Sequence, residues 1–262
     1  MSEKTLFSMN SLIATENLSV VNKDFSSLSD AIEDILPHDN AKGVTHPLLI
    51  GIDGPVTAGK TYCAEIVAQI ASRHTLNFHV IHYDWFMSPR NIRAKEIENF
   101  RSGNHTFERY DRIAYDAGRV EALLEKLQRA LKFRDQEFFE YTINPAYDRL
   151  TGECKNVISN SISTDSLVVV EGGGVLNSRF YDFFDISIRL DMGDTKEMIK
   201  RLYEREKHKN GNKLSLDFVK ERFLSLDYHF DNYLRHRDKS YFDFLIDTTD
   251  LSQPKLFIRD KK

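Results

Sequence analysis

Residues 47–61 read Pro-Leu-Leu-Ile-Gly-Ile-Asp-Gly-Pro-Val-Thr-Ala-Gly-Lys-Thr, and this stretch decides the fold. Its first part, 47–53, is short and almost wholly apolar, which predicts a buried strand. Its second part, 54–61, matches the pattern G-x-x-x-x-G-K-[ST]. Apolar residues then recur at helical spacing, at Cys63, Ile66, Val67 and Ile70. A strand, a glycine-bearing loop and a helix in this order predict a loop that binds phosphate groups.

Each part of this loop has a chemical reason. Glycines let backbone N–H groups turn inward around phosphate oxygens, and the positive end of the following helix points at them. Lys60 adds a charge at the β- and γ-phosphates, and Thr61 offers its hydroxyl to Mg²⁺. The N-K-x-D and D-x-x-G patterns of small GTPases do not follow the loop, which disfavours a GTP switch. The predicted ATP-binding residues are Gly54, Pro55, Val56, Thr57, Ala58, Gly59, Lys60 and Thr61.

Strand and helix patterns alternate along the rest of the chain, which predicts a mostly parallel sheet with helices on its faces. Further strands are expected at 78–83, 167–170, 186–190 and 242–246, and helices from 120 to 131 and from 216 to 233. Residues 137–158 resemble an inserted hairpin. The predicted fold class is therefore α/β, a three-layer P-loop NTPase fold with a mostly parallel sheet, an inserted β-hairpin flap and a basic helical lid.

The domain organisation follows from these elements. We expect an N-terminal extension over residues 1–45, with a short amphipathic helix that carries Leu28, Ile32 and Ile35 and stops at Pro37. One P-loop domain would occupy residues 46–250, with the flap at about 137–158 and the lid at about 200–214. Residues 251–262 would form a C-terminal tail.

The composition is that of an ordinary globular protein, with 262 residues, 41% of them hydrophobic and 29% charged. The net charge of -4 argues against binding nucleic acid by bulk electrostatics. Neither a signal-peptide core nor an apolar run of membrane-spanning length occurs, and Cys63 and Cys154 form no disulfide or zinc pattern. We therefore expect a cytoplasmic protein with no membrane and no nucleic-acid partner.

Two acidic residues follow predicted strands at the edge where the phosphate loop lies. Asp84 comes after the strand 78–83 and is the candidate general base, since it would lie across the γ-phosphate from the loop. Glu171 ends the strand 167–170, precedes three glycines and could hold Mg²⁺. A capping or turn role is the alternative for each acid. The predicted metal-binding residues are Thr61, Asp84 and Glu171.

A basic helix follows the strand 186–190, and Asp194 has the position of its cap. From Lys196 to Lys213 there are seven Lys or Arg residues against three Glu residues. Arg201 and Arg205 are four positions apart on one helix face, so both could reach one triphosphate and stabilise the transferred charge. A solvated helix surface is the alternative. The predicted catalytic residues are Asp84, Lys60, Arg201 and Arg205.

The order of these motifs resembles the uridine kinase-like group of P-loop phosphotransferases, which includes phosphoribulokinase, pantothenate kinase and nicotinamide riboside kinase. The resemblance implies that Asp84 is the base beside the metal and that Arg201 and Arg205 contact ATP. The group's nucleoside kinases carry a His shortly after the Tyr-Asp pair, where this chain has Gly152 and Glu153, so uridine is not supported as the acceptor. The residues that carry the resemblance are 54–61, 84–86, 147–148, 170–172 and 201–206.

The sequence thus predicts an enzyme, a kinase that transfers the γ-phosphate of ATP, with Mg²⁺, to a hydroxyl of a nucleoside-like, sugar-like or vitamin-like metabolite. Arg109 or Arg112 would anchor an anionic acceptor, whereas a neutral nucleoside would need stacking. A regulatory ATPase and a kinase of a protein or an antibiotic-like compound remain alternatives, and homo-oligomerisation and the preferred nucleotide donor stay open. The residues expected to line the acceptor are Tyr83, Trp85, Phe86, Arg109, Tyr110, Tyr147 and Asp148.

Overall fold

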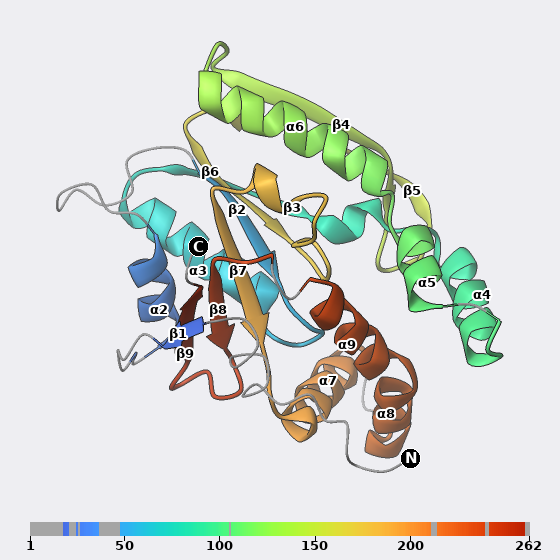
Figure 1. Cartoon of the computed structure of the whole chain (residues 1–262). Coiled ribbons are helices and arrows are strands. Elements are labelled where there is room, and N and C mark those ends of the chain that lie inside the picture. Colours follow the sequence, from blue (N-terminus) through green and yellow to red (C-terminus); the bar gives the residue numbers. More distant parts are fainter. Residues whose placement is uncertain are drawn as a thin grey trace.

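The computed structural model describes residues 18–20, 25, 27–36, 48–104, 106–210, 214–238 and 241–259. A seven-stranded sheet with the order β1-β9-β8-β7-β2-β6-β3 lies at its centre (Figure 1). The strands β3, β6, β2, β7 and β8 run parallel, which confirms the predicted α/β architecture. The bounds are β1 Leu18–Val20, β2 Leu48–Asp53, β3 Asn77–His82, β6 Ser166–Glu171, β7 Ile186–Asp191, β8 Phe244–Asp247 and β9 Lys255–Arg259.

Both ends of the chain contribute to this sheet. The strand β9 pairs antiparallel with β8, and β1 pairs antiparallel with β9. Residues 251–262, expected as a tail, therefore contain a strand of the central sheet, and residues 1–45, expected as an extension, contain another. Most of that extension, with the expected helix stop at Pro37, lies outside the described residues, as do residues 211–213 of the expected lid.

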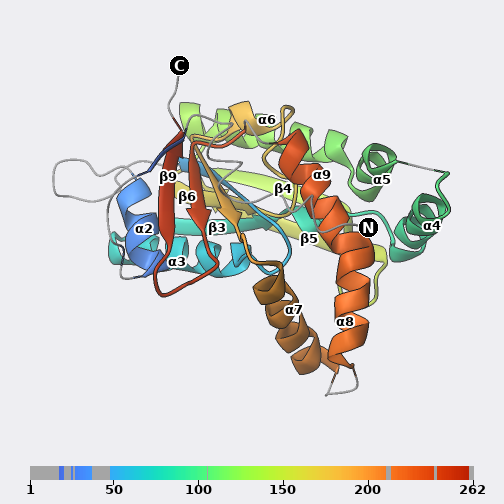
Figure 2. The ribbon, with the colours of Figure 1, turned by 60° about the horizontal axis from the view of Figure 1, so that its bottom comes forward.

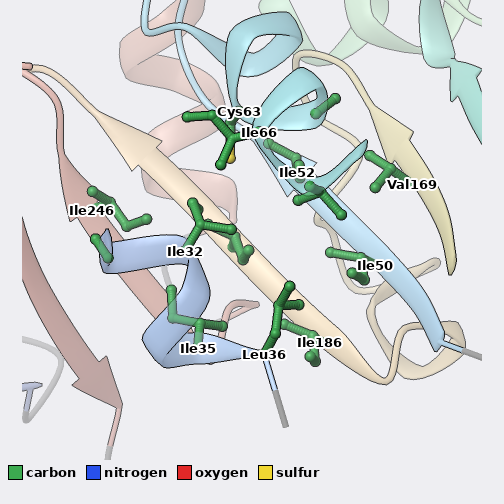
Figure 3. Close-up of a cluster of buried hydrophobic side chains, with 14 of the residues drawn as sticks. Ile32, Ile35, Leu36, Ile50, Ile52, Cys63, Ile66, Val169, Ile186 and Ile246 are labelled. Carbon is green, nitrogen blue, oxygen red and sulfur yellow. The ribbon is translucent and has the colours of Figure 1, made fainter. Parts of the chain in front are cut away.

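One face of the sheet is covered by α2 (Leu28–Ile35) and α3 (Lys60–Arg73). The Ser27 hydroxyl caps α2 by accepting a hydrogen bond of 3.2 Å from the Asp30 N–H. Figure 3 shows Ile32 of α2, Ile66 of α3 and the strand residue Ile52 in one cluster of buried apolar side chains. Since alternate strand residues face the same side, Leu48, Ile50 and Ile52 all belong to this core.

The opposite face is covered by α6 (Ala117–Phe133) and by a separate antiparallel hairpin of β4 (Phe138–Tyr147) and β5 (Cys154–Ser163). The hairpin extends to Ser163 and is longer than the predicted one. The periodic α6 residues pack on Leu49, Val168 and Val170 of the sheet. Helices and hairpin thus complete three layers, and the buried α6 residues are Val120, Leu124, Leu127 and Leu131.

Most of the remaining helices lie near the carboxyl ends of the parallel strands (Figure 2). The short helices η2 (Tyr83–Phe86), α4 (Arg90–Arg101) and α5 (Phe107–Ala114) connect β3 to α6. After β7, α7 (Thr195–Asn210) packs against α8 (Leu216–Arg222) through a cluster that includes Leu202 and Phe223. The predicted helix 216–233 continues through a π-helical turn, η4 (Phe223–Asp227), into α9 (Tyr228–Arg237). A short helix η3 (Tyr181–Phe183) precedes β7. Within the described ranges no helix is long and apolar enough to cross a membrane.

Candidate active site

The loop between β2 and α3 has the backbone of a phosphate-binding loop. Gly54 has a φ of 152°, and a Cβ there would lie 2.5 Å from the Leu190 carbonyl oxygen, so no other residue fits without strain. The helix α3 begins at Lys60, directly after Gly59. The Lys60 ammonium donates to the carbonyl oxygens of Gly54 (2.8 Å) and Pro55 (2.9 Å). The lysine therefore lies over its own loop, and Thr61 is exposed in the first turn of α3.

The loop is tied to the glycine-rich turn after β6 by Asp53, which the sequence analysis did not single out. Its buried carboxylate accepts hydrogen bonds from the N–H groups of Gly54 (2.6 Å), Gly174 (2.8 Å) and Leu176 (3.1 Å). Three backbone donors satisfy a carboxylate that would be costly to bury alone. Asp53 therefore holds the phosphate loop and the turn 172–174 in fixed relative positions.

Glu171 ends β6, next to β2, and its side chain is almost fully buried. The Glu171 Oε1 atom lies 2.5 Å from Nδ1 of His82. Burial opposes ionisation, but the His82 hydrogen bond and the charges of Lys60, His82 and Arg149 outweigh it and lower the pKa of Glu171. A charged carboxylate is thus held beside the loop lysine, and Oε2 has no hydrogen-bond partner among the described residues.

Asp84 lies in η2, two residues beyond the end of β3. The strand β6 lies between β2 and β3, so the strand that precedes Asp84 is not the direct neighbour of the loop strand. The Asp84 carboxylate is partly exposed and faces Arg149, whose Nε lies 3.3 Å from Oδ2. Because Arg149 also influences the pKa of Glu171, the two acids lie near one guanidinium.

Arg201 and Arg205, expected to belong to a lid, lie on α7, which Asp194 caps by accepting hydrogen bonds from the N–H groups of Lys196 (2.7 Å) and Glu197 (3.4 Å). Arg201 donates to the Glu197 carboxylate at 3.0 Å and to the Thr249 carbonyl at 2.8 Å. Arg205 donates to Glu206 at 3.3 Å. Nη1 of Arg201 and Nε of Arg205 are buried and have no partner among the described residues.

The expected acceptor residues fall into two groups. Tyr83, Phe86, Tyr110 and Tyr147 are buried, and the Tyr83 ring stacks on Tyr115 at 4.3 Å between centroids. Trp85 is partly buried and contacts His82 edge-on at 5.0 Å. Asp148, in contrast, accepts from the Leu150 N–H (2.8 Å) and the Thr151 hydroxyl (3.0 Å). Its carboxylate builds the β4–β5 turn.

Arg109 and Arg112, expected to anchor an anion, both lie on the outer surface of α5. Arg109 pairs with Glu96 at 3.5 Å and Arg112 pairs with Glu108 at 2.9 Å. Both side chains are more than half exposed. Two other arginines contact residues of the expected site: Arg93 donates to the Tyr147 hydroxyl, and Arg149 pairs with Asp84. Sequence reasoning missed both because neither belongs to a motif.

A further group of ion pairs, centred on Arg237, lies between α9 and α5. Arg237 pairs with Asp238 at 2.5 Å and with Asp111 of α5, and its Nη2 donates to the Gly174 carbonyl at 3.4 Å. Burial raises the pKa of Asp111, although the Arg237 charge opposes this shift. The group joins α5, α9 and the glycine-rich turn, and so holds these three segments together at the carboxyl ends of the strands.

Comparisons with known proteins identify the family of this chain. A sequence model of the Phosphoribulokinase / Uridine kinase family matches residues 49–252. A comparison with curated proteins found no matching sequence. A possible uridine kinase from Bacillus stearothermophilus is 19% identical, with a TM-score of 0.52 over 83% of this chain and 96% of its own. D-glycerate 3-kinase from Cryptococcus neoformans var. grubii is 15% identical, with a TM-score of 0.55 over 94% and 95%.

At these identities the solved structures support the fold alone. The family match covers most of the chain, including the phosphate loop, both strand-end acids and the arginines of α7. The chain therefore belongs to the phosphoribulokinase/uridine kinase family and is a P-loop small-molecule kinase.

Proposed function

We propose that this kinase transfers the γ-phosphate of ATP to a hydroxyl group of a small metabolite, with Asp84 as the general base. The observation that carries the proposal is the convergence of Lys60, Glu171 and Asp84 at one edge of the sheet. The charge of Lys60 helps to lower the pKa of the Glu171 carboxyl. Arg149 pairs with Asp84, and its charge also lowers the pKa of Glu171. The phosphate loop, the strand-end acid Glu171 and Asp84 therefore lie near one another, which supports the proposal.

In the proposed reaction, the loop N–H groups and Lys60 hold the phosphates of ATP. Asp84 accepts the proton of the acceptor hydroxyl, and the hydroxyl oxygen forms a bond to the γ-phosphorus. The bond between this phosphorus and the β–γ bridging oxygen breaks, and ADP leaves with that electron pair. Since the buried donors of Arg201 and Arg205 lack partners among the described residues, we infer that they bind phosphate oxygens.

The oxygen groups at this edge fit Mg²⁺, a hard cation. Thr61, Glu171 and Asp84 would hold it. Within the described residues no three acidic, His or Cys side chains form a metal cluster, which suits an ion held by few protein groups together with phosphates and water. When bound, Mg²⁺ supplies positive charge that neutralises the phosphate oxygens.

The test is ADP release from Mg-ATP by the full chain across nucleosides, vitamins, hydroxy acids, sugars, sugar phosphates and aminoglycoside-like compounds. The Lys60→Ala variant serves as the blank. We expect one chemical class to stimulate ADP release, together with formation of its phosphomonoester. Tight ATP binding with no stimulation by any compound would contradict the proposal and favour a regulatory ATPase or a macromolecular acceptor.

A further inference from the structure

The carboxylate proposed as the general base is not free in this structure. Nε of Arg149 lies 3.3 Å from Oδ2 of Asp84, in an ion pair between η2 and the turn that joins β4 to β5. A guanidinium at this distance directs its N–H groups at the carboxylate. An anion that binds Arg149 therefore competes with Asp84 for the same guanidinium.

The turn that carries Arg149 is fixed, although the Arg149 side chain is 65% exposed. The Arg90 N–H donates to the Gly152 carbonyl at 2.7 Å, and the Arg90 guanidinium donates to the Arg149 carbonyl at 3.2 Å. Gly152 has a φ of 80°, and a Cβ there would lie 2.6 Å from the Arg90 Nε atom. The backbone of Arg149 is thus held against α4, while its exposed side chain is able to exchange partners.

Arg93 of α4 supplies a second positive charge, at the end of β4 from which this turn begins. It donates to the Ser88 carbonyl at 2.9 Å and to the Tyr147 hydroxyl at 2.5 Å, and its Cζ lies 4.9 Å from the centre of the Tyr147 ring. These partners are neutral, and in the described part of the chain Arg93 forms no ion pair with a carboxylate. A half-buried guanidinium with only neutral partners favours a nearby anion.

Arg93 and the Asp84–Arg149 pair lie around one group of aromatic residues. Burial raises the pKa of Tyr115, the Asp84 charge raises it further, and the Arg93 charge lowers it, so both charges lie near this ring. The Tyr147 hydroxyl accepts a hydrogen bond from Arg93. Tyr147 also ends β4 and precedes Arg149 by two positions in the chain. An anion between the two guanidinium groups would therefore lie close to the Asp84 carboxylate.

We infer that the acceptor carries an anionic group, a carboxylate or a phosphate, which Arg149 and Arg93 bind beside the reacting hydroxyl. The acceptor anion replaces Asp84 as the partner of Arg149, and Asp84 is then free to accept the hydroxyl proton. A neutral acceptor leaves the Asp84–Arg149 pair intact. The planar guanidinium suits both anions because each offers paired oxygens. This inference rests on the proposed function and names its substrate class.

The test compares related acceptors with and without an anionic group, namely ribose, ribonate and ribose phosphate, and glycerol, glycerate and glycerol phosphate. Binding to the full chain is measured by calorimetry with saturating Mg-ADP, so that the nucleotide site is filled. We expect at least one anion to bind about tenfold or more tightly than its neutral counterpart, the scale of one charged hydrogen bond. The carboxylate and phosphate members of each set distinguish the two kinds of anion.

Three variants separate a binding role of Arg149 from a structural one. Arg149→Ala should remove the preference for the anionic acceptor and raise the KM for that acceptor by about tenfold, without changing the KM for ATP. Arg149→Lys should retain part of the preference, because lysine keeps the positive charge. Asp84→Asn should tighten anion binding, because no carboxylate then competes for Arg149. Arg129→Ala, an exposed arginine on α6, is the control and should leave the preference unchanged.

Two results would overturn the inference. Either no anion of either set binds more tightly than its neutral counterpart, or Arg149→Ala keeps the full preference. Phosphoryl transfer to a neutral acceptor without any anion preference would contradict the inference and leave the proposed function standing. Arg149-dependent anion binding without phosphoryl transfer would support the anion site and contradict the proposed function.

Discussion

Lys60 is the residue of the loop motif with the most direct proposed role in phosphoryl transfer. Its ammonium group donates to two carbonyl oxygens of its own loop, at 2.8 Å and 2.9 Å, and so lies over the loop that we propose binds the phosphates of ATP. Lys60→Ala should therefore abolish turnover and weaken ATP binding. ADP release and nucleotide titration measure the two effects, with Lys132→Ala on the exposed side of α6 as the control. Normal turnover of Lys60→Ala would rule out the phosphate-loop assignment.

Asp84 is expected to act on the transfer step and not on nucleotide binding. Asp84→Asn should lower the rate of phosphoryl transfer by about 10²-fold or more, the usual scale for an acid-base group, while ATP binds nearly as before. Single-turnover transfer and ATP titration test the two halves of this prediction. The exposed Asp135→Asn is a matched control. If transfer survives in Asp84→Asn, the base is another residue.

The residues that belong to motifs could be predicted from the sequence, whereas those that act across the fold could not. Lys60 and Glu171 follow from a loop pattern and from an acid after an apolar strand. Arg149 is a surface residue of a turn, and its distance of 3.3 Å to Asp84 depends on how the hairpin packs against α4. No periodicity encodes that packing. The residues expected from the sequence to anchor an anionic acceptor, Arg109 or Arg112, instead pair with glutamates and are more than half exposed.

At the scale of elements, α9 places an acid against the phosphate loop. The Val56 N–H donates to Asp231 at 3.4 Å. Burial raises the pKa of Asp231 to about 7, and nearby Asp227 raises it too, while the charges of Lys60 and Arg235 and the Val56 hydrogen bond oppose the shift. The stabilising contribution of the protonated carboxyl is complete below the ordinary pKa of 3.8 and is lost as the pH rises to about 7.

Asp231→Asn should therefore raise the free energy of unfolding above neutral pH and change it little near the ordinary pKa of 3.8. The shift from 3.8 to about 7 corresponds to at most about 4 kcal/mol. Thermal unfolding of both proteins from acidic to mildly basic pH measures the difference. A variant that is equally or less stable than the parent above neutral pH would show that the charged carboxylate is well accommodated.

The periodic patterns predicted which helices and strands occur better than they predicted where each one begins, ends or changes its geometry. The apolar spacing of 216–233 predicted one helix, and the chain does continue from α8 to α9, but with the π-helical turn Phe223–Asp227 between them. A π turn adds a residue to the helix without changing which residue types are used, so the pattern does not mark it. The strand β9 was not predicted, because its five residues carry a short apolar run at 256–258 and no alternation.

For the molecule as a whole, the N-terminal segment belongs to the core. In α2, Leu28, Ile32 and Ile35 are buried against α3 and the sheet. Ile32→Ala should lower the free energy of unfolding by about 2–5 kcal/mol, as for other large-to-small changes in a packed core. Ser29→Ala, on the partly exposed side of α2, should change it far less. Chemical denaturation measures both, and equal stability of Ile32→Ala and the parent would contradict a structural role for α2.

The central claim concerns the whole molecule, namely that the chain moves the γ-phosphate of ATP to a small hydroxylated acceptor. The most direct measurement follows the fate of that phosphate by phosphorus NMR, in the presence of Mg-ATP and the acceptor that stimulates ADP release most. We predict a phosphomonoester of the acceptor formed in equal amount to ADP, and none with Lys60→Ala. Release of the γ-phosphate only as inorganic phosphate would contradict the account.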